Sequence, residues 1–185
     1  MNRPGKLLII SGLSGAGKGT MIKKYFELYP DESVLSVSAT TRAPRPGEEN
    51  GKAYFFKTEE EFKKMIDEDK FLEYARYVDN FYGTPKEWVY EKMAEGKNVL
   101  LEIEQQGAFQ VKKKEPGAVM IFIMPPSEEE LIKRLRGRGS ETEEQIGKRL
   151  AQAQKEKEKI KYYDHVIVNE DVEKSAQMLH NILRS

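Results

Sequence analysis

Short apolar runs separated by amphipathic segments form the main pattern along this chain. The apolar runs that predict strands cover residues 7–11, 34–38, 99–103, 119–124 and 166–168. Runs that are apolar throughout are typical of buried parallel strands. The segments between them predict helices, including residues 21–29 and a last helix with Val172, Ala176, Leu179 and Leu183 on one face. This alternation predicts an α/β fold with a parallel sheet and right-handed crossovers.

Three segments carry signals for the start of a helix. Thr58 with Glu61 and Ser127 with Glu130 have the spacing of a capping box. Thr84-Pro85 followed by Glu87 has a candidate N-cap hydroxyl, a proline suited to the first helical position and a carboxylate that can reach back. We therefore predict helices that begin directly after Thr58, Thr84 and Ser127.

Two segments interrupt the alternation and divide the chain into three units. Residues 39–83 contain strand-like pieces at 53–56 and 71–78 around one short helix, which predicts a small α+β insertion. Residues 125–163 are helical in pattern and rich in charge. The core is then expected to consist of residues 1–38, 84–124 and 164–185.

A glycine-rich loop follows the first predicted strand. It reads Gly12-Leu13-Ser14-Gly15-Ala16-Gly17-Lys18-Gly19-Thr20 and leads into a predicted helix. In this context glycines let successive backbone N–H groups point at one anion, and the helix N-terminus adds partial positive charge. Lys18 supplies a point charge for the terminal phosphates of a nucleoside triphosphate. An ordinary glycine-rich turn is the minority interpretation.

The residue after the lysine departs from the usual phosphate-loop pattern. That pattern has Ser or Thr there to hold Mg²⁺, whereas this chain has Gly19 and its hydroxyl comes at Thr20. Either Thr20 serves, or the metal is held mostly by water and the nucleotide.

Composition narrows the range of functions. Lys and Arg together number 31, as do Asp and Glu, so the formal net charge is zero. This balance argues against a bulk electrostatic nucleic-acid binder. The 185 residues include no cysteine, which excludes disulfides, zinc–thiolate sites and a cysteine nucleophile. No apolar run is long enough to span a bilayer and no signal-peptide pattern is present, so we expect a cytoplasmic protein without a membrane partner.

A second cluster of candidate residues lies in the insertion. Ser38-Ala39-Thr40-Thr41-Arg42-Ala43-Pro44-Arg45-Pro46-Gly47-Glu48 has two arginines in a segment that turn residues keep non-helical. Arginine offers a rigid fork for phosphate oxygens, and Tyr54 and Tyr82 can add hydroxyl donors. Taken alone, a surface loop with solvated arginines would be the better interpretation.

Together with the phosphate loop, this segment closely resembles the guanylate kinase family. The resemblance rests on Thr40-Thr41-Arg42-x-Pro44-Arg45-x-Gly47-Glu48-x-x-Gly51-x-x-Tyr54-x-Phe56, Phe71-Leu72-Glu73-Tyr74-Ala75, Tyr82-Gly83-Thr84, Gln106-Gly107-Ala108 and Arg138-Gly139-Ser140-Glu141-Thr142. It covers nearly the whole chain. It implies a P-loop nucleoside monophosphate kinase fold whose core binds ATP, whose inserted lobe (residues 39–83) binds GMP and whose helical lid (residues 125–163) closes over the triphosphate. The implied reaction is Mg²⁺-dependent transfer of a phosphoryl group from ATP to GMP and to dGMP.

The resemblance also implies roles for individual residues. The GMP site would comprise Ser38, Arg42, Arg45, Tyr54, Glu73, Tyr82, Gly83, Thr84 and Glu104, with the arginines and tyrosines on phosphate. The ATP site would comprise Gly12, Leu13, Ser14, Gly15, Ala16, Gly17, Lys18, Gly19, Thr20, Arg134, Arg138 and Asn169. Catalysis would use Lys18, Arg45, Arg138 and Arg149. Thr20 and Glu102 would hold the metal through water.

The Glu73 carboxylate also suits guanine for a chemical reason that does not depend on the resemblance. Guanine presents N1–H and an exocyclic amine side by side, and one carboxylate can accept both; adenine presents an unprotonated N1, which a carboxylate repels. A polar site of this kind rejects a mismatched partner strongly. From the strand pattern alone, however, Glu73 is better interpreted as a solvent-side residue.

The chain departs from the family pattern at two places, and two other functions remain open. Leu13 stands where the family commonly has proline, and Glu102-Ile103-Glu104 replaces an Asp-x-Asp pair. One alternative is a P-loop kinase that acts on AMP, UMP or dTMP. The other is a non-catalytic guanylate-kinase-like interaction module, although such modules have typically lost the phosphate loop.

Overall fold

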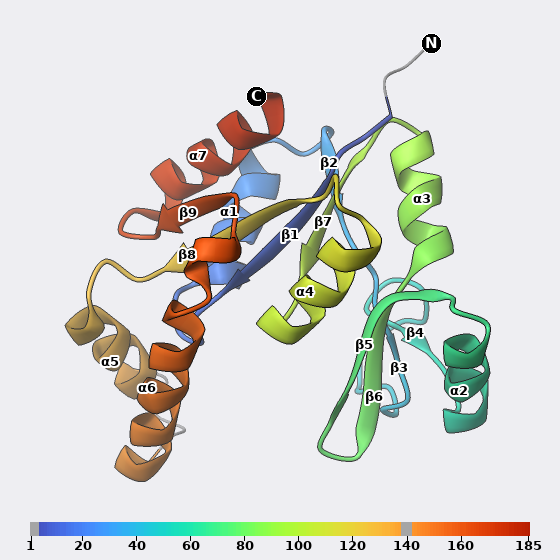
Figure 1. Cartoon of the computed structure of the whole chain (residues 1–185), viewed down its shortest axis with the longest axis horizontal. Coiled ribbons are helices and arrows are strands. Elements are labelled where there is room, and N and C mark those ends of the chain that lie inside the picture. Colours follow the sequence, from blue (N-terminus) through green and yellow to red (C-terminus); the bar gives the residue numbers. More distant parts are fainter. Residues whose placement is uncertain (1–3, 138–141) are drawn as a thin grey trace.

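The computed structural model describes residues 4–137 and 142–185, and a parallel sheet lies at its centre (Figure 1). Its five strands are β1 (Leu7–Gly12), β2 (Ser33–Leu35), β7 (Asn98–Glu102), β8 (Val119–Met124) and β9 (His165–Val168). They lie in the order β2-β7-β1-β8-β9, and every neighbouring pair is parallel. The predicted parallel α/β fold is therefore confirmed.

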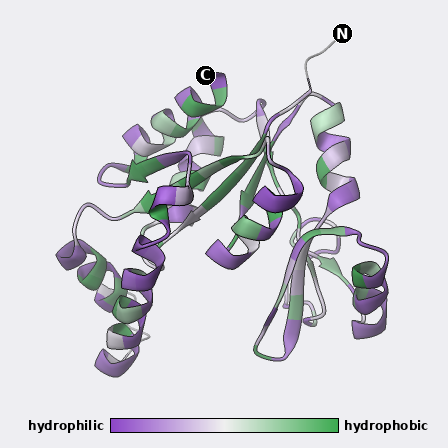
Figure 2. Ribbon diagram, in the orientation of Figure 1, coloured by the Kyte–Doolittle hydropathy of each residue, from purple (hydrophilic) through white to green (hydrophobic). Residues whose placement is uncertain are grey.

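Helices cover this sheet and explain why its strands are apolar throughout. They are α1 (Lys18–Leu28), α3 (Lys86–Ala94), α4 (Gln105–Lys114) and α7 (Val172–Arg184). In Figure 1, α1 lies behind the sheet and α4 in front of it, so Leu8, Ile9 and Ile10 of β1 are almost fully buried. Figure 2 shows the same contrast as apolar strands surrounded by helices with polar outer faces.

A second, smaller sheet forms the inserted lobe. It contains β3 (Ala39–Thr40), β4 (Phe55–Phe56), β5 (Phe71–Tyr77) and β6 (Asn80–Pro85) in the order β4-β3-β6-β5. Helix α2 (Glu59–Asp67) packs on it through Phe62, whose ring stacks on Phe71 at 4.4 Å. The capping box is confirmed, because Thr58 Oγ1 accepts from the Glu61 N–H and the Glu61 carboxylate accepts from the Thr58 N–H.

A pair of helices, α5 (Glu128–Gly137) and α6 (Glu143–Lys157), lies on the opposite side of the core from the lobe (Figure 1). A 3₁₀ turn, η1 (Ile160–Tyr162), links α6 to β9. The N-cap predicted for α5 is confirmed, since Ser127 Oγ accepts from the Glu130 N–H at 3.1 Å. Within the described part of the chain, no helix is both long and apolar enough to cross a membrane.

Three details of the predicted elements are wrong. The strand predicted for 34–38 ends at Leu35, because the chain then crosses to the lobe and the Ser38 carbonyl accepts from Phe55. The helix predicted to begin after Thr84 begins at Lys86 instead. Thr84 lies in strand β6, which the pattern did not predict, and its hydroxyl binds Glu73 rather than a helix terminus.

Candidate nucleotide site

The loop of residues 12–20 connects β1 to α1 in the shape that its glycines permit. Gly15 and Gly17 have φ values of 92° and 84°, in the left-handed region that side chains disfavour. A Cβ at Gly15 would also lie 2.9 Å from Leu131 of α5. Gly17 is the N-cap of α1, so the unpaired N–H groups of the first helical turn face the loop. The loop therefore has the form of an anion cradle.

Buried polar contacts hold this loop from the outside. Asn169 is 2% exposed, and its Nδ2 donates to the Ala16 carbonyl at 2.8 Å. Arg134 donates from Nη1 to the same carbonyl and from Nη2 to the Asn169 carbonyl. The Oδ1 atom of Asn169 is buried without a hydrogen-bond partner. Arg134 and Asn169 thus brace the loop from α5 and from the end of β9.

Lys18 lies among acidic side chains at the mouth of the loop. Its Nζ donates to the Gly12 carbonyl at 3.0 Å. Glu102 is the last residue of β7, the strand next to β1. Its side chain remains accessible to solvent, but partial burial raises the pKa of its carboxyl group. The Lys18 ammonium opposes this rise in pKa, and the Glu104 carboxylate adds to it. Lys18, Glu102 and Glu104 are thus electrostatic neighbours.

The acidic side chains near the loop offer few ligands for a metal ion. Among residues 4–137 and 142–185, no group of three or more His, Asp or Glu side chains is arranged to hold an ion. Mg²⁺ usually keeps several waters and takes one or two carboxylates plus substrate phosphates. Glu102 Oε1 lies 3.9 Å from the position of a Cβ at Gly19, next to the loop. One carboxylate beside a phosphate cradle fits that mode of binding.

In the lobe, Glu73 is buried and has a defined partner. It is 7% exposed, and its Oε1 accepts from the Thr84 hydroxyl at 2.7 Å across the β5–β6 pair. Burial raises the pKa of the Glu73 carboxyl group, and the bonds from Thr84 oppose the rise. Glu73 is therefore not the solvent-side residue that its strand pattern favoured. Gly83 is buried next to Thr84.

The arginine segment is organised around Glu48, to which sequence reasoning gave no role. Arg42 Nη2 donates to both Glu48 carboxylate oxygens at 2.9 Å. This contact lowers the pKa of Glu48, and the backbone N–H of Arg45 lowers it further. The Arg42 guanidinium lies 5.3 Å from the Tyr54 ring centroid, and Tyr54 meets the Tyr82 ring edge-on. The signal in the sequence was the position of Glu48, an acidic residue in the same turn as Arg42, which could have predicted this ion pair.

The remaining candidates are less closely gathered. The side chain of Arg45 is exposed, and Ser38 is half-buried and bonds into the lobe through its carbonyl. Arg149 of α6 donates to Ser14 Oγ at 2.5 Å, which brings α6 to the phosphate loop. Thr20 is exposed in the first turn of α1. Arg138 lies outside the described residues.

The arrangement therefore consists of two groups joined by α4. The phosphate loop, Arg134, Arg149 and Asn169 form the first group. Glu73, Thr84, Arg42, Tyr54 and Tyr82 belong to the lobe. Glu104 is the N-cap of α4, and Gly107 in the first turn of that helix touches Glu73. The first turn of α4 therefore meets the lobe at Glu73, while its N-cap, Glu104, is an electrostatic neighbour of Glu102.

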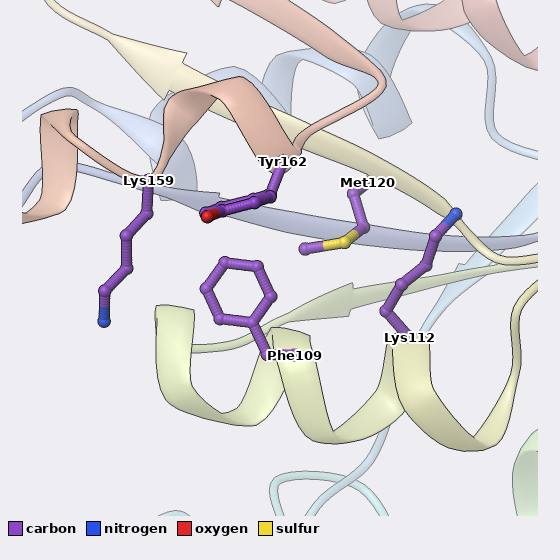
Figure 3. A pocket seen from close by; sticks show the side chains of 5 residues that line it. All are labelled: Phe109, Lys112, Met120, Lys159 and Tyr162. Atoms are coloured by element: carbon purple, nitrogen blue, oxygen red, sulfur yellow. The ribbon is translucent and has the colours of Figure 1, made fainter.

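A separate hollow lies on another face of α4, away from these groups. Figure 3 shows that Phe109, Lys112, Met120, Lys159 and Tyr162 line it. Its lining is almost wholly apolar, which does not suit a phosphate, and it contains none of the predicted site residues. The chemistry therefore points to the two polar groups rather than to this hollow.

Comparisons with known proteins find similarity along nearly the whole chain. The family model described as guanylate kinase matches residues 4–185. A guanylate kinase of Caldanaerobacter subterraneus subsp. tengcongensis is 51% identical over 183 residues, covering 99% of this chain and 88% of that protein. One from Clostridioides difficile is 52% identical over 183 residues, covering 99% and 89%. The crystal structure of guanylate kinase from Anaplasma phagocytophilum is similar with a TM-score of 0.73 at 38% identity, covering 99% of this chain and 86% of that one.

Proposed function

The chain belongs to the guanylate kinase family and transfers the γ-phosphoryl group of ATP to GMP, and we propose how its own residues carry out that reaction. The observation that carries the proposal is the buried Glu73 carboxylate held by Thr84. Guanine offers two adjacent donors that match such a carboxylate, whereas adenine offers a lone pair in the same place. Ser38 and Glu104 complete the base site in this proposal.

The phosphate of GMP is bound by the arginine segment. Arg42, Arg45, Tyr54 and Tyr82 supply charge and hydroxyl donors, and Glu48 holds Arg42 ready before the substrate arrives. Arginine forks match phosphate oxygens in two parallel hydrogen bonds. Because the Arg42 side chain is already oriented, binding loses less side-chain entropy.

ATP is bound by residues 12–20, with the β- and γ-phosphates on the loop amides and Lys18. Arg134 and Asn169 keep the loop in shape from behind. Arg149 already touches Ser14 and would reach the transferring group together with Arg138, whose role rests on the sequence motif alone. The reaction needs alignment and neutralised charge rather than covalent help, because the GMP phosphate is itself an anionic nucleophile.

The family's phosphoryl transfer needs a divalent metal, and we propose Mg²⁺. Glu102 and Thr20 would hold it through water, with the remaining positions taken by the nucleotide. When bound, the ion neutralises charge on the transferring phosphates.

We also propose dGMP as an acceptor, since no side chain in the proposal depends on the ribose 2′-hydroxyl. We further propose a cytoplasmic location, because ATP and GMP are found together there.

The test is a coupled ADP-release assay on the pure protein with ATP, Mg²⁺ and GMP, dGMP, AMP, UMP or dTMP in turn. Turnover limited to GMP and dGMP, and abolished by a metal chelator, supports the proposed base and metal sites. Turnover with another acceptor would remove the guanine role of Glu73. No turnover with any acceptor would favour a binding module and direct attention to Glu102 and Glu104.

A further inference from the structure

One face of α4 runs along strand β5 on both sides of Glu73. Gln110 donates from Nε2 to the Tyr74 carbonyl and accepts at Oε1 from the Tyr74 N–H, both at 3.2 Å. Lys114 Nζ donates to the Phe71 carbonyl at 2.7 Å. Residues three and four apart lie on the same side of a helix, so Gly107, Gln110 and Lys114 form one face. A helix of the core thereby fixes the backbone of the lobe strand that carries the guanine-reading side chain.

Gly107 stands at the point where this face meets the carboxylate. A Cβ at residue 107 would lie 2.7 Å from Glu73 Oε2, 3.2 Å from Cδ and 3.3 Å from Cγ. All three atoms belong to one side chain, and none belongs to the backbone. An added methyl group would therefore displace the Glu73 carboxylate and leave the strand in place. The Thr84 hydroxyl donates to the other oxygen of this carboxylate. The Glu73 carboxylate therefore cannot both move away from the added methyl group and keep its hydrogen bond to Thr84.

We propose that Gly107 and Gln110 are positioning residues that set the acceptor specificity of the enzyme from the core helix α4. Gln110 fixes the strand beside Glu73, and the absent side chain of Gly107 leaves the carboxylate where it can accept N1–H and the exocyclic amine of guanine together. The inference rests on the proposed guanine role of Glu73. A displacement of the Glu73 carboxylate by a few tenths of an ångström weakens one of its two parallel hydrogen bonds to guanine. The affinity for GMP is then lower, and so is the preference for GMP over IMP, which lacks the exocyclic amine.

The experiment compares Gly107→Ala with Gly117→Ala. Gly117 is a matched control, since a Cβ there meets no atom within 4 Å. We expect Gly107→Ala to raise the KM for GMP about tenfold or more with a much smaller change in kcat, because ground-state and transition-state contacts to the base are lost together. The KM for ATP should not change. The ratio of kcat/KM for GMP to that for IMP should fall, and Gly117→Ala should match the parent in every parameter.

A double-mutant cycle with Glu73→Ala identifies the route of the effect. With no carboxylate to displace, Gly107→Ala should cause no further loss of GMP use in the Glu73→Ala background. Gln110→Ala provides a second test without added bulk and should raise the KM for GMP in the same direction. Thermal unfolding of each variant checks that the fold is kept.

The outcomes separate the two proposals. If Glu73→Ala impairs GMP use while Gly107→Ala and Gln110→Ala do not, the role of α4 is wrong and the base site stands. If Gly107→Ala costs the same with and without Glu73, its effect does not pass through the carboxylate and the inference is overturned. If Glu73→Ala leaves GMP use unchanged, the proposed base site fails and the inference fails with it.

Discussion

Replacing Thr84 by valine tests the electrostatics of the proposed base site directly. The substitution keeps the shape of the side chain and removes the hydroxyl that donates to Glu73 at 2.7 Å. Such a bond contributes about 1.5–3 kcal/mol to an ionised acceptor and about 0.5–1.5 kcal/mol to a neutral one. The difference, about 1–1.5 kcal/mol, makes ionisation of the carboxyl group roughly tenfold less favourable in the variant.

The sign of the pH dependence follows from the burial of Glu73. Burial already raises the pKa of this carboxyl group above its ordinary value of 4.5, and the Thr84 hydroxyl lowers it. Thr84→Val therefore raises the pKa further. Only the ionised carboxylate accepts both guanine donors, so kcat/KM for GMP should fall on the acid side and recover towards alkaline pH. The acid limb of the profile should move to higher pH.

The assay is kcat/KM for GMP at saturating ATP and Mg²⁺, measured from mildly acidic to mildly alkaline pH. The profile of the variant is divided by that of the parent, so that ionisation of the substrate phosphate cancels. Direct contact of Thr84 with guanine would add a loss that is the same at every pH. Thr40→Val is the control, because Thr40 is equally buried but donates to the Phe81 carbonyl. A flat ratio for Thr84→Val, or an equal slope for Thr40→Val, would refute the reasoning.

Three further substitutions test other parts of the structure. Lys18→Ala should lower kcat about a thousandfold or more, because charge on the transferring group is no longer neutralised; near-normal turnover would remove Lys18 from the reaction. Arg45→Ala should mainly raise the KM for GMP, and unchanged GMP kinetics would exclude its contact with the substrate phosphate. Thr58→Ala removes the N-cap bond of α2, so unfolding should become easier by about 1 kcal/mol; an unchanged melting temperature would contradict the capping role.

Local patterns predicted the core of this fold well. The run at 7–11 and the glycines that follow give β1, the loop and α1 because strand, loop and helix lie in one continuous segment. The start of α2 at Thr58 was equally accessible, since both partners of its capping box lie within one turn. Contacts of this kind depend only on neighbours along the chain.

Other features depended on partners that are distant along the chain. Thr84-Pro85 with Glu87 satisfies the local rules for a helix start, yet the Thr84 hydroxyl is taken by Glu73 across a strand pair. Strand β6 was missed because the hairpin turns at Val78-Asp79, where Val78 has a φ of 55° in a position that glycine usually takes. The exclusion of a side chain at Gly107 likewise becomes visible only when α4 meets β5.

The separate packing of the inserted lobe has a consequence for local unfolding. Ala39, Phe62 and Phe71 form a buried cluster of their own, apart from the large cluster around β1 and β8. So small a cluster stabilises its surroundings less than the main core does, and such units open independently of the rest of a protein. Amide hydrogens of β3 and β4 should then exchange with solvent far sooner than those of β1. Since a ligand stabilises the state that binds it, the proposed binding of GMP to the lobe should slow this exchange there and leave the exchange of β1 unchanged. The substrate would then contribute to the stability of the folded lobe.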